Sequence, residues 1–370
     1  MNLHPPIPKR RANRGVSLVE LMVGVAIGLI GVVAIFQAVT VWTKHTQTTS
    51  SGSEAQVAGT LALFNIERDL KQAGHGFGTA LNTIMGCNVQ SNVAGVNMRP
   101  VEITPGAPAG SPDTISVLLG NSSVFVDETD FVDSTVATKR LNRPGAFRVG
   151  DVALIAGAVP PGGPIACMFI GLTTNIDANG WIQHDPGVAF PDRLNLAVPP
   201  VFVTGKIYNL GPRPRYDVWT VDNNRHTLSR SDSLADVPAL IPVADGIVNM
   251  KAEYGYDADG DGQIANVEWV AALPPAPDWT RVLAVRIAVL VRGRQFERNG
   301  DSTATGTAAV TPTASNPSYF GGQPFLMRNV DGTLDAFGNA NADPNNWRYY
   351  RYRVYERVIP LRNMLWGIYG

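Results

Sequence analysis

The sequence predicts an α+β fold, in which one long N-terminal helix, transmembrane and then amphipathic, packs on a large, mainly antiparallel β head. Three observations lead to this prediction. An uncharged run of membrane length lies near the N-terminus, helical spacing of apolar residues continues past it, and short apolar runs then alternate with turn residues. We therefore expect a leader at 1–15, a membrane-spanning helix at 16–43, a helical continuation packing on the head at 44–76, and the head itself at 77–370.

The first predicted element is the membrane-spanning helix. Leu21 to Trp42 are 22 residues without a formal charge. As an α-helix this run is about 33 Å long, enough to cross a hydrocarbon core of about 30 Å. Residues 1–15 ahead of it contain four basic residues and no acidic ones, a bias that holds the N-terminus in the cytoplasm; the basic residues are Lys9, Arg10, Arg11 and Arg14. A secretory signal peptide is the competing interpretation, but its apolar region would be shorter, about 7–15 residues.

Glu20 is the one charge beside this apolar run. A carboxylate at the centre of a membrane helix costs on the order of 2.5–3.5 kcal/mol on insertion scales, so such a residue usually has a partner. Cleavage after Gly15 would give Val16 a free α-amino group one helical turn from Glu20. The amine and the carboxylate would then neutralise each other, within one chain or between neighbours. In the competing interpretation, Glu20 lies at the level of the lipid headgroups.

Two glycines in the same run have a spacing that favours helix packing. Gly24 and Gly28 form a small-x-x-x-small pair, which lets helices approach each other closely in lipid. We therefore expect them to lie in helix–helix contacts.

The helix is expected to continue beyond the membrane. Its apolar residues recur at helical spacing in two adjacent stripes: Val57, Leu61 and Phe64 in one, and Leu63, Ile66 and Leu70 in the other. Gly74 and Gly76 are expected to end it, because glycine commonly follows a helix.

The rest of the chain reads as antiparallel β structure. The candidate strands are TISVLLG, DVALIAG, ACMFIGL, PVFVTGKIYNL, YDVWTV, RHTLSRS, VLAVRIAVLVRG and, near the C-terminus, RYRVYERVIPLRNM followed by a short tail. A hairpin turn is expected at 222–224. The stretch 297–346 is rich in Thr, Ala, Asn, Gly and Pro and has little periodicity, so we expect a long exposed loop outside the core.

The N-terminal residues carry a family resemblance. RGVSLVELMVGVAIGLI, residues 14–30, resembles the class III leader of type IV prepilins, which has a short basic leader, Gly at the cut and Glu at the fifth mature position. The resemblance implies cleavage after Gly15 by a prepilin peptidase and N-methylation of Val16. It also implies that Glu20 pairs with the N-terminus of an adjacent subunit during assembly. Val16 replaces the usual Phe of the family, and Gln37 stands where major pilins have Pro.

A narrower resemblance covers more of the chain. The region from ERDLKQAG to Cys87, the large β head with its acidic loop and the closing VIPLRN resemble the PilW family of minor pilins. This implies an inner-membrane precursor with a periplasmic head that, after processing, joins a complex priming pilus growth near the tip. The implied partners are other minor pilins, the major pilin, the prepilin peptidase and a tip-associated adhesin, and the implied outputs are twitching motility and cell adhesion.

Charge and composition exclude other classes. The formal charge is −1, and four of the 30 basic residues lie in the leader, which leaves 26 against 31 acidic residues, or −5, after cleavage. No basic tract follows the leader, so we expect no direct binding of nucleic acid. The five histidines have no zinc spacing and there is no G-x-S-x-G elbow, so we do not predict an enzyme.

The chain has two cysteines, Cys87 and Cys167. Outside the cytoplasm an even number favours a disulfide. A bond closing about 80 residues stabilises by roughly 4 kcal/mol in the chain-entropy view. Two buried free thiols are the alternative.

The strongest chemical motif is DADGDGQIANVE, which matches the calcium-loop pattern D-x-[DN]-x-[DN]-G-x₅-E. Calcium takes six to eight oxygen ligands. Asp257, Asp259 and Asp261 would supply carboxylates, Gln263 its backbone carbonyl, and Glu268 both carboxylate oxygens. A strand is expected to lead into the loop. We predict Ca²⁺ as the cofactor, with a plain Asp/Gly hairpin turn as the alternative.

Two other functions remain open on the sequence. A J-type pseudopilin of type II secretion shares the leader and the architecture, although this head is large for that group. A membrane-tethered, calcium-dependent adhesin or binding protein would need no filament. Replacement of Glu20 separates the two kinds of function, because it should abolish piliation in a pilin and leave adhesion intact in a tether.

Overall fold

The fold is described from a computed structural model. It covers residues 15, 17–80, 84–90, 95–124, 128–135, 137–158, 165–172, 179–184, 202, 204–275, 277–297, 313, 315–334 and 345–369. The chain divides into two compact units, Met1–Gly52 and Ser53–Gly370. The unit that contains the head thus begins at Ser53, inside the segment 44–76 that we expected to pack on it.

One helix, α1, runs from Leu18 to Gln72. Its segment Leu18–Thr43 has a mean hydropathy of 2.6 and no buried residues, and it is long and apolar enough to cross a membrane. The first turn is closed by a hydrogen bond from the Leu21 N–H to the Ser17 carbonyl, 3.1 Å long. No proline interrupts the apolar segment, so its helical hydrogen bonding continues through the span.

The last turns of α1 belong to the head. Leu63, Ile66 and Leu70 are buried in its core, as the amphipathic spacing predicts. The second predicted stripe, Val57, Leu61 and Phe64, is exposed instead. The helix ends where the chain turns at Gly74, whose φ of +77° suits glycine, and the Gly74 N–H then bonds to the Leu118 carbonyl at 3.1 Å.

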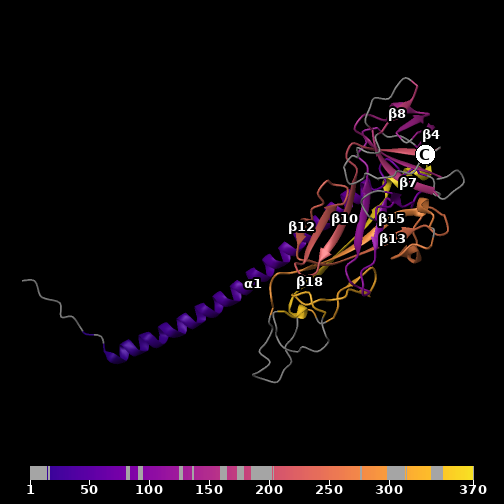
Figure 1. Ribbon diagram of the computed structural model, residues 1–370. Coiled ribbons are helices and arrows are strands. Elements are labelled where there is room, and N and C mark those ends of the chain that lie inside the picture. Colours follow the sequence, from indigo (N-terminus) through magenta and orange to yellow (C-terminus); the bar gives the residue numbers. More distant parts are fainter. Residues whose placement is uncertain are drawn as a thin grey trace, which may run out of the picture. The chain divides into compact units, whose positions relative to one another are not determined.

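The described residues of the head form three larger sheets and one small hairpin (Figure 1). The seven-stranded sheet has the order β1-β7-β6-β9-β4-β5-β8, the five-stranded sheet β12-β11-β10-β3-β2, and the four-stranded sheet β14-β13-β15-β18, while β16 and β17 pair alone. The strands are β1 (Val89–Gln90), β2 (Val101–Thr104), β3 (Thr114–Leu119), β4 (Thr129–Ser134), β5 (Thr138–Leu141), β6 (Val152–Ala158), β7 (Ile165–Gly171), β8 (Trp181–Gln183), β9 (Gly205–Gly211), β10 (Arg215–Asp222), β11 (Thr227–Asp232), β12 (Ile241–Asp245), β13 (Ile247–Tyr256), β14 (Trp269–Val270), β15 (Val282–Arg292), β16 (Ser318–Tyr319), β17 (Gln323–Pro324) and β18 (Tyr352–Pro360). Each predicted strand has a counterpart, although residues 200, 201 and 203 of PVFVTGKIYNL lie outside the described residues and the end of RYRVYERVIPLRNM is helical. The expectation of a mainly antiparallel head is confirmed.

The predicted hairpin turn at 222–224 joins β10 to β11. The two strands are antiparallel, with Asp222 opposite Thr227. The Asp222 carboxylate accepts hydrogen bonds from the backbone N–H groups of Asn224 at 2.8 Å and Arg225 at 3.1 Å. This is the Asx-type bonding that favours Asp at the start of a turn.

The seven-stranded sheet includes one pairing that the sequence did not predict. Short β1 runs parallel to β7, with Val89 opposite Cys167. Cys87 lies two residues before this pair and is joined to Cys167 by a disulfide, with the two Cα atoms 6.1 Å apart. The segment that follows α1 is therefore covalently tied to an edge of this sheet.

The four-stranded sheet carries contacts on both faces. On one side Tyr355 of β18 lies against α1 at Gly59. On the other side a second core cluster forms, consisting of Ala288, Leu290, Tyr319, Phe325, Met327 and Trp347. The expected exposed loop over 297–346 is therefore wrong for the described part of that stretch, since Tyr319, Phe325 and Met327 are buried.

The C-terminal tail is a helix. After β18 the chain forms α3 (Arg362–Tyr369), with Leu361 and Met364 buried in the main core. The Asn363 side-chain amide donates a hydrogen bond to the Ala73 carbonyl at 2.9 Å. A side chain of α3 thus satisfies the carbonyl of Ala73, just past the end of α1.

Candidate functional site

The predicted assembly residues lie on the first unit. Gly15 is exposed ahead of the helix, Glu20 is exposed in its first turn, and Val16 lies outside the described residues. A Cβ added at Gly24 or Gly28 would meet no atom within 4 Å. These positions are therefore open to contacts with other helices in the membrane or in a filament.

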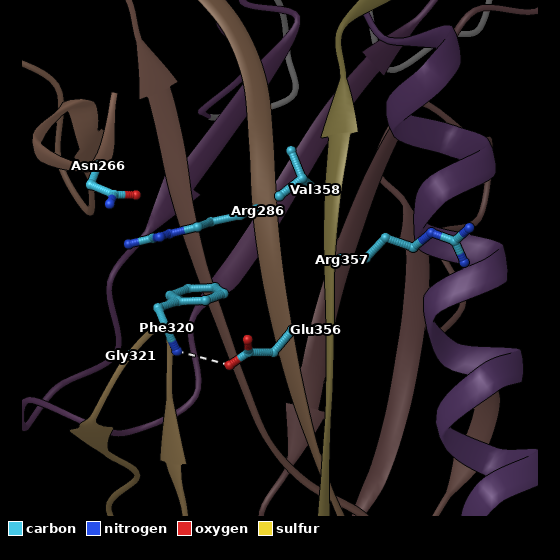
Figure 2. A pocket seen from close by; sticks show the side chains of 7 residues that line it. All are labelled: Asn266, Arg286, Phe320, Gly321, Glu356, Arg357 and Val358. Atoms are coloured by element: carbon cyan, nitrogen blue, oxygen red, sulfur yellow. Dashed lines mark hydrogen bonds between the residues drawn. The ribbon is translucent and has the colours of Figure 1, made fainter. Parts of the chain in front are cut away.

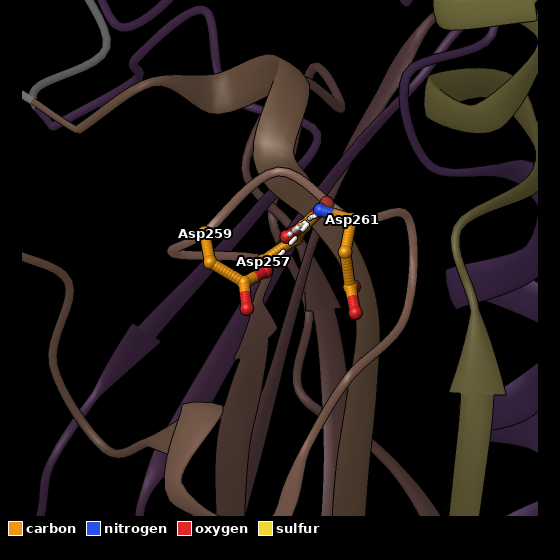
Figure 3. A group of neighbouring side chains, drawn as sticks. All are labelled: Asp257, Asp259 and Asp261. Carbon is orange, nitrogen blue, oxygen red and sulfur yellow. Dashed lines mark hydrogen bonds between the residues drawn. The ribbon is translucent and has the colours of Figure 1, made fainter.

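The acidic loop, residues 257–268, follows directly from β13, the strand that was expected to lead into it (Figure 3). One carboxylate oxygen of each of Asp257, Asp259 and Asp261 lies within 4.8 Å of the others. Asp257 is buried, whereas the other two are exposed. Gly260 and Gly262 both have φ near +80°, which lets the backbone turn tightly around Asp257.

Backbone N–H groups hold the Asp257 carboxylate in place. Oδ1 accepts from Gly260 at 2.6 Å and from Asp261 at 3.1 Å, while Oδ2 accepts from Gly262 at 2.9 Å. Burial opposes ionisation of Asp257, but these backbone hydrogen bonds outweigh it and lower the pKa of Asp257 below its ordinary value. The carboxylate is therefore ionised and oriented at neutral pH.

Glu268 has a different position from the one predicted. Its buried carboxylate accepts hydrogen bonds from the Ala258 N–H and the Ala265 N–H, each 2.7 Å long. It is not part of the converging group of aspartates. Glu268 closes the two ends of the loop, and Arg281 adds a bond from Nη1 to the Ala258 carbonyl at 2.8 Å.

The donor chemistry of this loop fits a calcium ion. Three carboxylates converge within reach of one cation, and carboxylate oxygens are the ligands that Ca²⁺ prefers. When bound, the ion would offset the mutual repulsion of Asp257, Asp259 and Asp261. Gln263 is exposed at the next position of the loop, and its N–H bonds to Asp261 Oδ1 at 2.7 Å.

A pocket of about 480 Å³ lies beside the loop, and Figure 2 shows the side chains that line it. They come from η3 (Asn266–Glu268), β15, β18 and the turn of the β16–β17 hairpin: Asn266, Arg286, Phe320, Gly321, Glu356, Arg357 and Val358. Sequence reasoning missed this pocket. Its residues lie on four separate segments and follow no common spacing, so no sequence signal was available.

Comparisons with known proteins agree with this architecture. Residues 215–363 match the family described as Type IV Pilus-assembly protein W, or PilW. Residues 10–36 match the Prokaryotic N-terminal methylation motif. No curated protein matches the chain. Among solved structures, it is similar to the type IV-like pilin TTHA1219 from Thermus thermophilus, at 14% identity over 58% of this chain and 89% of that one. The TM-score of 0.21 is too low for this similarity to carry an argument.

The processing motif, the apolar helix and the antiparallel β head define a membrane-anchored protein of the type IV pilin class. The PilW match runs from the start of β10 to the first residues of α3 and narrows this assignment. Together the two matches, over residues 215–363 and 10–36, support a PilW-like type IV minor pilin. Pilins are typically structural proteins, and none of the described residues gives positive evidence of catalysis.

Proposed function

We propose that this minor pilin is part of the complex that primes assembly of the type IV pilus and then lies near its tip. The observation that carries the proposal is the combination of a prepilin methylation motif with an unburied apolar helix joined to a PilW-type head. A carboxylate such as Glu20 is costly in lipid unless it has a partner, and the amino group of a neighbouring subunit in a filament would supply one.

The proposed sequence of events begins in the inner membrane. The precursor waits there with its head in the periplasm. A prepilin peptidase cuts after Gly15 and methylates Val16, and Glu20 then pairs with the amino group of a neighbouring subunit. The proposed partners are the other minor pilins, the major pilin and a tip-associated adhesin, so the filament serves motility and adhesion. The PilW match favours this function over the J-type pseudopilin.

Replacing Glu20 tests the proposal. In cells whose only copy is Glu20→Ala, we expect the number of pili per cell to fall at least tenfold by electron microscopy, since the amine–carboxylate pairing is lost. In wild-type pili, mass spectrometry should find a methylated Val16 as the first residue of this protein. Antibodies to the head should label filament ends.

A matched control lies on the same helix. Glu54 is exposed and only weakly paired, 3.8 Å from Arg294, and Glu54→Ala should leave piliation unchanged. Normal piliation in the Glu20→Ala strain, or a retained leader in intact pili, would contradict the proposal. Loss of type II secretion with normal pili would point to a pseudopilin, and adhesion without filaments to a membrane-tethered adhesin.

We also propose that the acidic loop binds Ca²⁺ through Asp257, Asp259 and Asp261. The converging carboxylates and the aligned backbone of the loop support this proposal. A ligand that binds only the folded state stabilises it by about 2.7 kcal/mol at one hundred times its dissociation constant. Bound calcium should therefore raise the melting temperature of the full chain in detergent by roughly 5 °C.

Asp261→Ala should remove this rise, whereas Asp236→Ala should not, because Asp236 is an exposed acid on the separate connection between β11 and β12. The measurement is a pair of melting curves, with calcium and with chelator, for each variant. Identical curves for the unaltered protein would end the calcium proposal without affecting the assignment as a minor pilin.

A further inference from the structure

The pocket beside the acidic loop contains an acid that has no ion-pair partner among the described residues. Three charged residues line it, namely Arg286, Glu356 and Arg357. The two arginines are already engaged with other acids. Of these three residues, Glu356 alone makes no ion pair with a described residue, and its side chain is exposed and accessible to a ligand.

Arg286 is neutralised and fixed in place. Its Nε donates to Glu253 Oε2 at 2.7 Å, and its Nη2 bonds to the same oxygen. The guanidinium lies over Trp269 at 4.9 Å from the ring centroid and over Phe320 at 4.4 Å. It therefore serves as part of a rigid wall, and little of its charge remains for a ligand.

Arg357 points away from the pocket. Figure 2 shows its side chain directed toward α1, where Nε lies 3.1 Å from Glu67 Oε2. Its contribution to the pocket is therefore not a cation.

Glu356 and the hairpin turn form the opposite wall. One oxygen of Glu356 accepts from the Phe320 N–H at 2.8 Å, and this is the bond drawn in Figure 2. Phe320 has a φ of +45°, a conformation that a bulky residue rarely adopts. Residues held in this way cluster at functional sites, and here the conformation places the ring beside Arg286.

The pocket thus combines a carboxylate with apolar surface. Val358 is 57% exposed, and Phe320 and Asn266 lie on the other sides. A lysine or arginine side chain has the complementary chemistry, because its apolar stem packs on apolar surface while its charged head meets an acid.

We propose that this pocket binds an arginine or lysine side chain presented by a partner protein. The charged head would pair with Glu356, and the stem would lie between Val358 and Phe320. This inference goes beyond the role in pilus assembly, because the pocket lies on the head and the assembly proposal rests on the N-terminal helix. If the peptides do not bind, the assembly proposal is unaffected. The Glu20→Ala substitution, in turn, should leave peptide binding to this pocket unchanged.

Surface plasmon resonance with the full chain in detergent tests the proposal. The probes are blocked tripeptides with glycine on both sides of a central arginine, lysine, citrulline or glutamate. We expect binding of the arginine and lysine peptides, and at least tenfold weaker binding of the neutral citrulline peptide. Glu356→Gln should weaken the arginine peptide at least tenfold, because glutamine keeps an acceptor for the Phe320 N–H but lacks the charge.

Two further variants complete the test. Asp236→Asn removes an exposed acid elsewhere and should leave binding unchanged. Val358→Lys places an amine in the pocket and should block binding of the peptide. Because Val358 is exposed, this variant tests the pocket even if Glu356→Gln does not fold. Equal binding of the arginine and citrulline peptides, preference for the glutamate peptide, binding unaffected by Glu356→Gln, or no binding at all would each overturn the proposal.

Discussion

Arg215 pairs with two buried acids near the end of α1, and Arg230 and Arg68 lie farther from them, 3.7 Å from Asp217 and 3.5 Å from Asp69. Arg215 Nη2 lies 2.7 Å from Asp217 Oδ2 and 3.3 Å from Asp69 Oδ1, and both carboxylates are fully buried. Burial raises the pKa of Asp217 to about 7, and the neighbouring Asp69 adds to the effect while Arg215 opposes it. Ionising Asp217 is therefore costly even though Arg215 and Arg230 lie beside it.

This arrangement predicts a pH dependence of stability. Because the folded pKa of Asp217 exceeds its unfolded value, the folded state binds more protons between about pH 4 and pH 7. The free energy of unfolding should therefore fall as pH rises through this window, by at most about 1.4 kcal/mol per pH unit. Asp217→Asn should flatten that slope in urea titrations at about pH 5 and pH 7, whatever its effect on absolute stability.

Asp236→Asn is the control and should keep the slope of the unaltered protein. Parallel dependence on pH in the Asp217→Asn variant would show that this carboxyl is ionised throughout, with Arg215 compensating fully for its burial.

At the scale of elements, α1 approaches β18 closely because of one glycine. A Cβ on Gly59 would overlap the ring of Tyr355. Gly52, in the same helix, has nothing within 4 Å of a Cβ position. Comparing the same substitution at these two glycines therefore separates the effect of helix propensity from the effect of packing against Tyr355.

We expect opposite effects from the same substitution at these sites. Gly52→Ala should stabilise by about 0.5–1 kcal/mol, the usual gain of alanine over glycine in a helix. Gly59→Ala should destabilise by about 1–3 kcal/mol, because overpacking exceeds that gain. Denaturant unfolding of the full chain in detergent measures both, and a stabilised Gly59→Ala variant would show that Tyr355 yields without cost.

On the scale of the whole molecule, the disulfide connects two parts of the head that lie far apart in the sequence. It joins the segment after α1 to the seven-stranded sheet across a sequence separation of 80. A cross-link of this length restricts the unfolded chain and contributes about 4 kcal/mol in the chain-entropy view.

Removing the disulfide should therefore be costly. The double variant Cys87→Ser, Cys167→Ser is expected to unfold about 4 kcal/mol more easily in urea. Reductant should weaken the unaltered protein to a similar extent and leave the double variant unchanged. If reductant also destabilised the double variant, the loss could not be assigned to this bond.

Much of this architecture followed from local sequence pattern. Periodic spacing of apolar residues predicted the apolar run, the Leu63–Leu70 stripe and the alternating strands directly. The burial of Tyr319 and Phe325 did not follow, because these aromatics are scattered in a turn-rich stretch and find their neighbours only through tertiary packing. Parallel pairing of β1 with β7 was hidden for the same reason, since a two-residue strand has no period.

The candidate sites divide in the same way. The acidic loop is contiguous, so its motif indicated which aspartates converge, yet the pattern gave no sign that Glu268 bonds to two backbone N–H groups. The pocket around Arg286 draws on four segments and became visible only in three dimensions.

The bond from Asn363 to the carbonyl of Ala73 joins groups 290 residues apart in sequence. During synthesis the C-terminal turns of α1 are made early, and β18 with α3 are made last. Until they arrive, Leu63, Ile66 and Leu70 lack much of their packing, and contacts of such separation form slowly. The apolar face of α1 is therefore exposed for longest during this interval, when uncovered apolar surface makes a chain prone to aggregate.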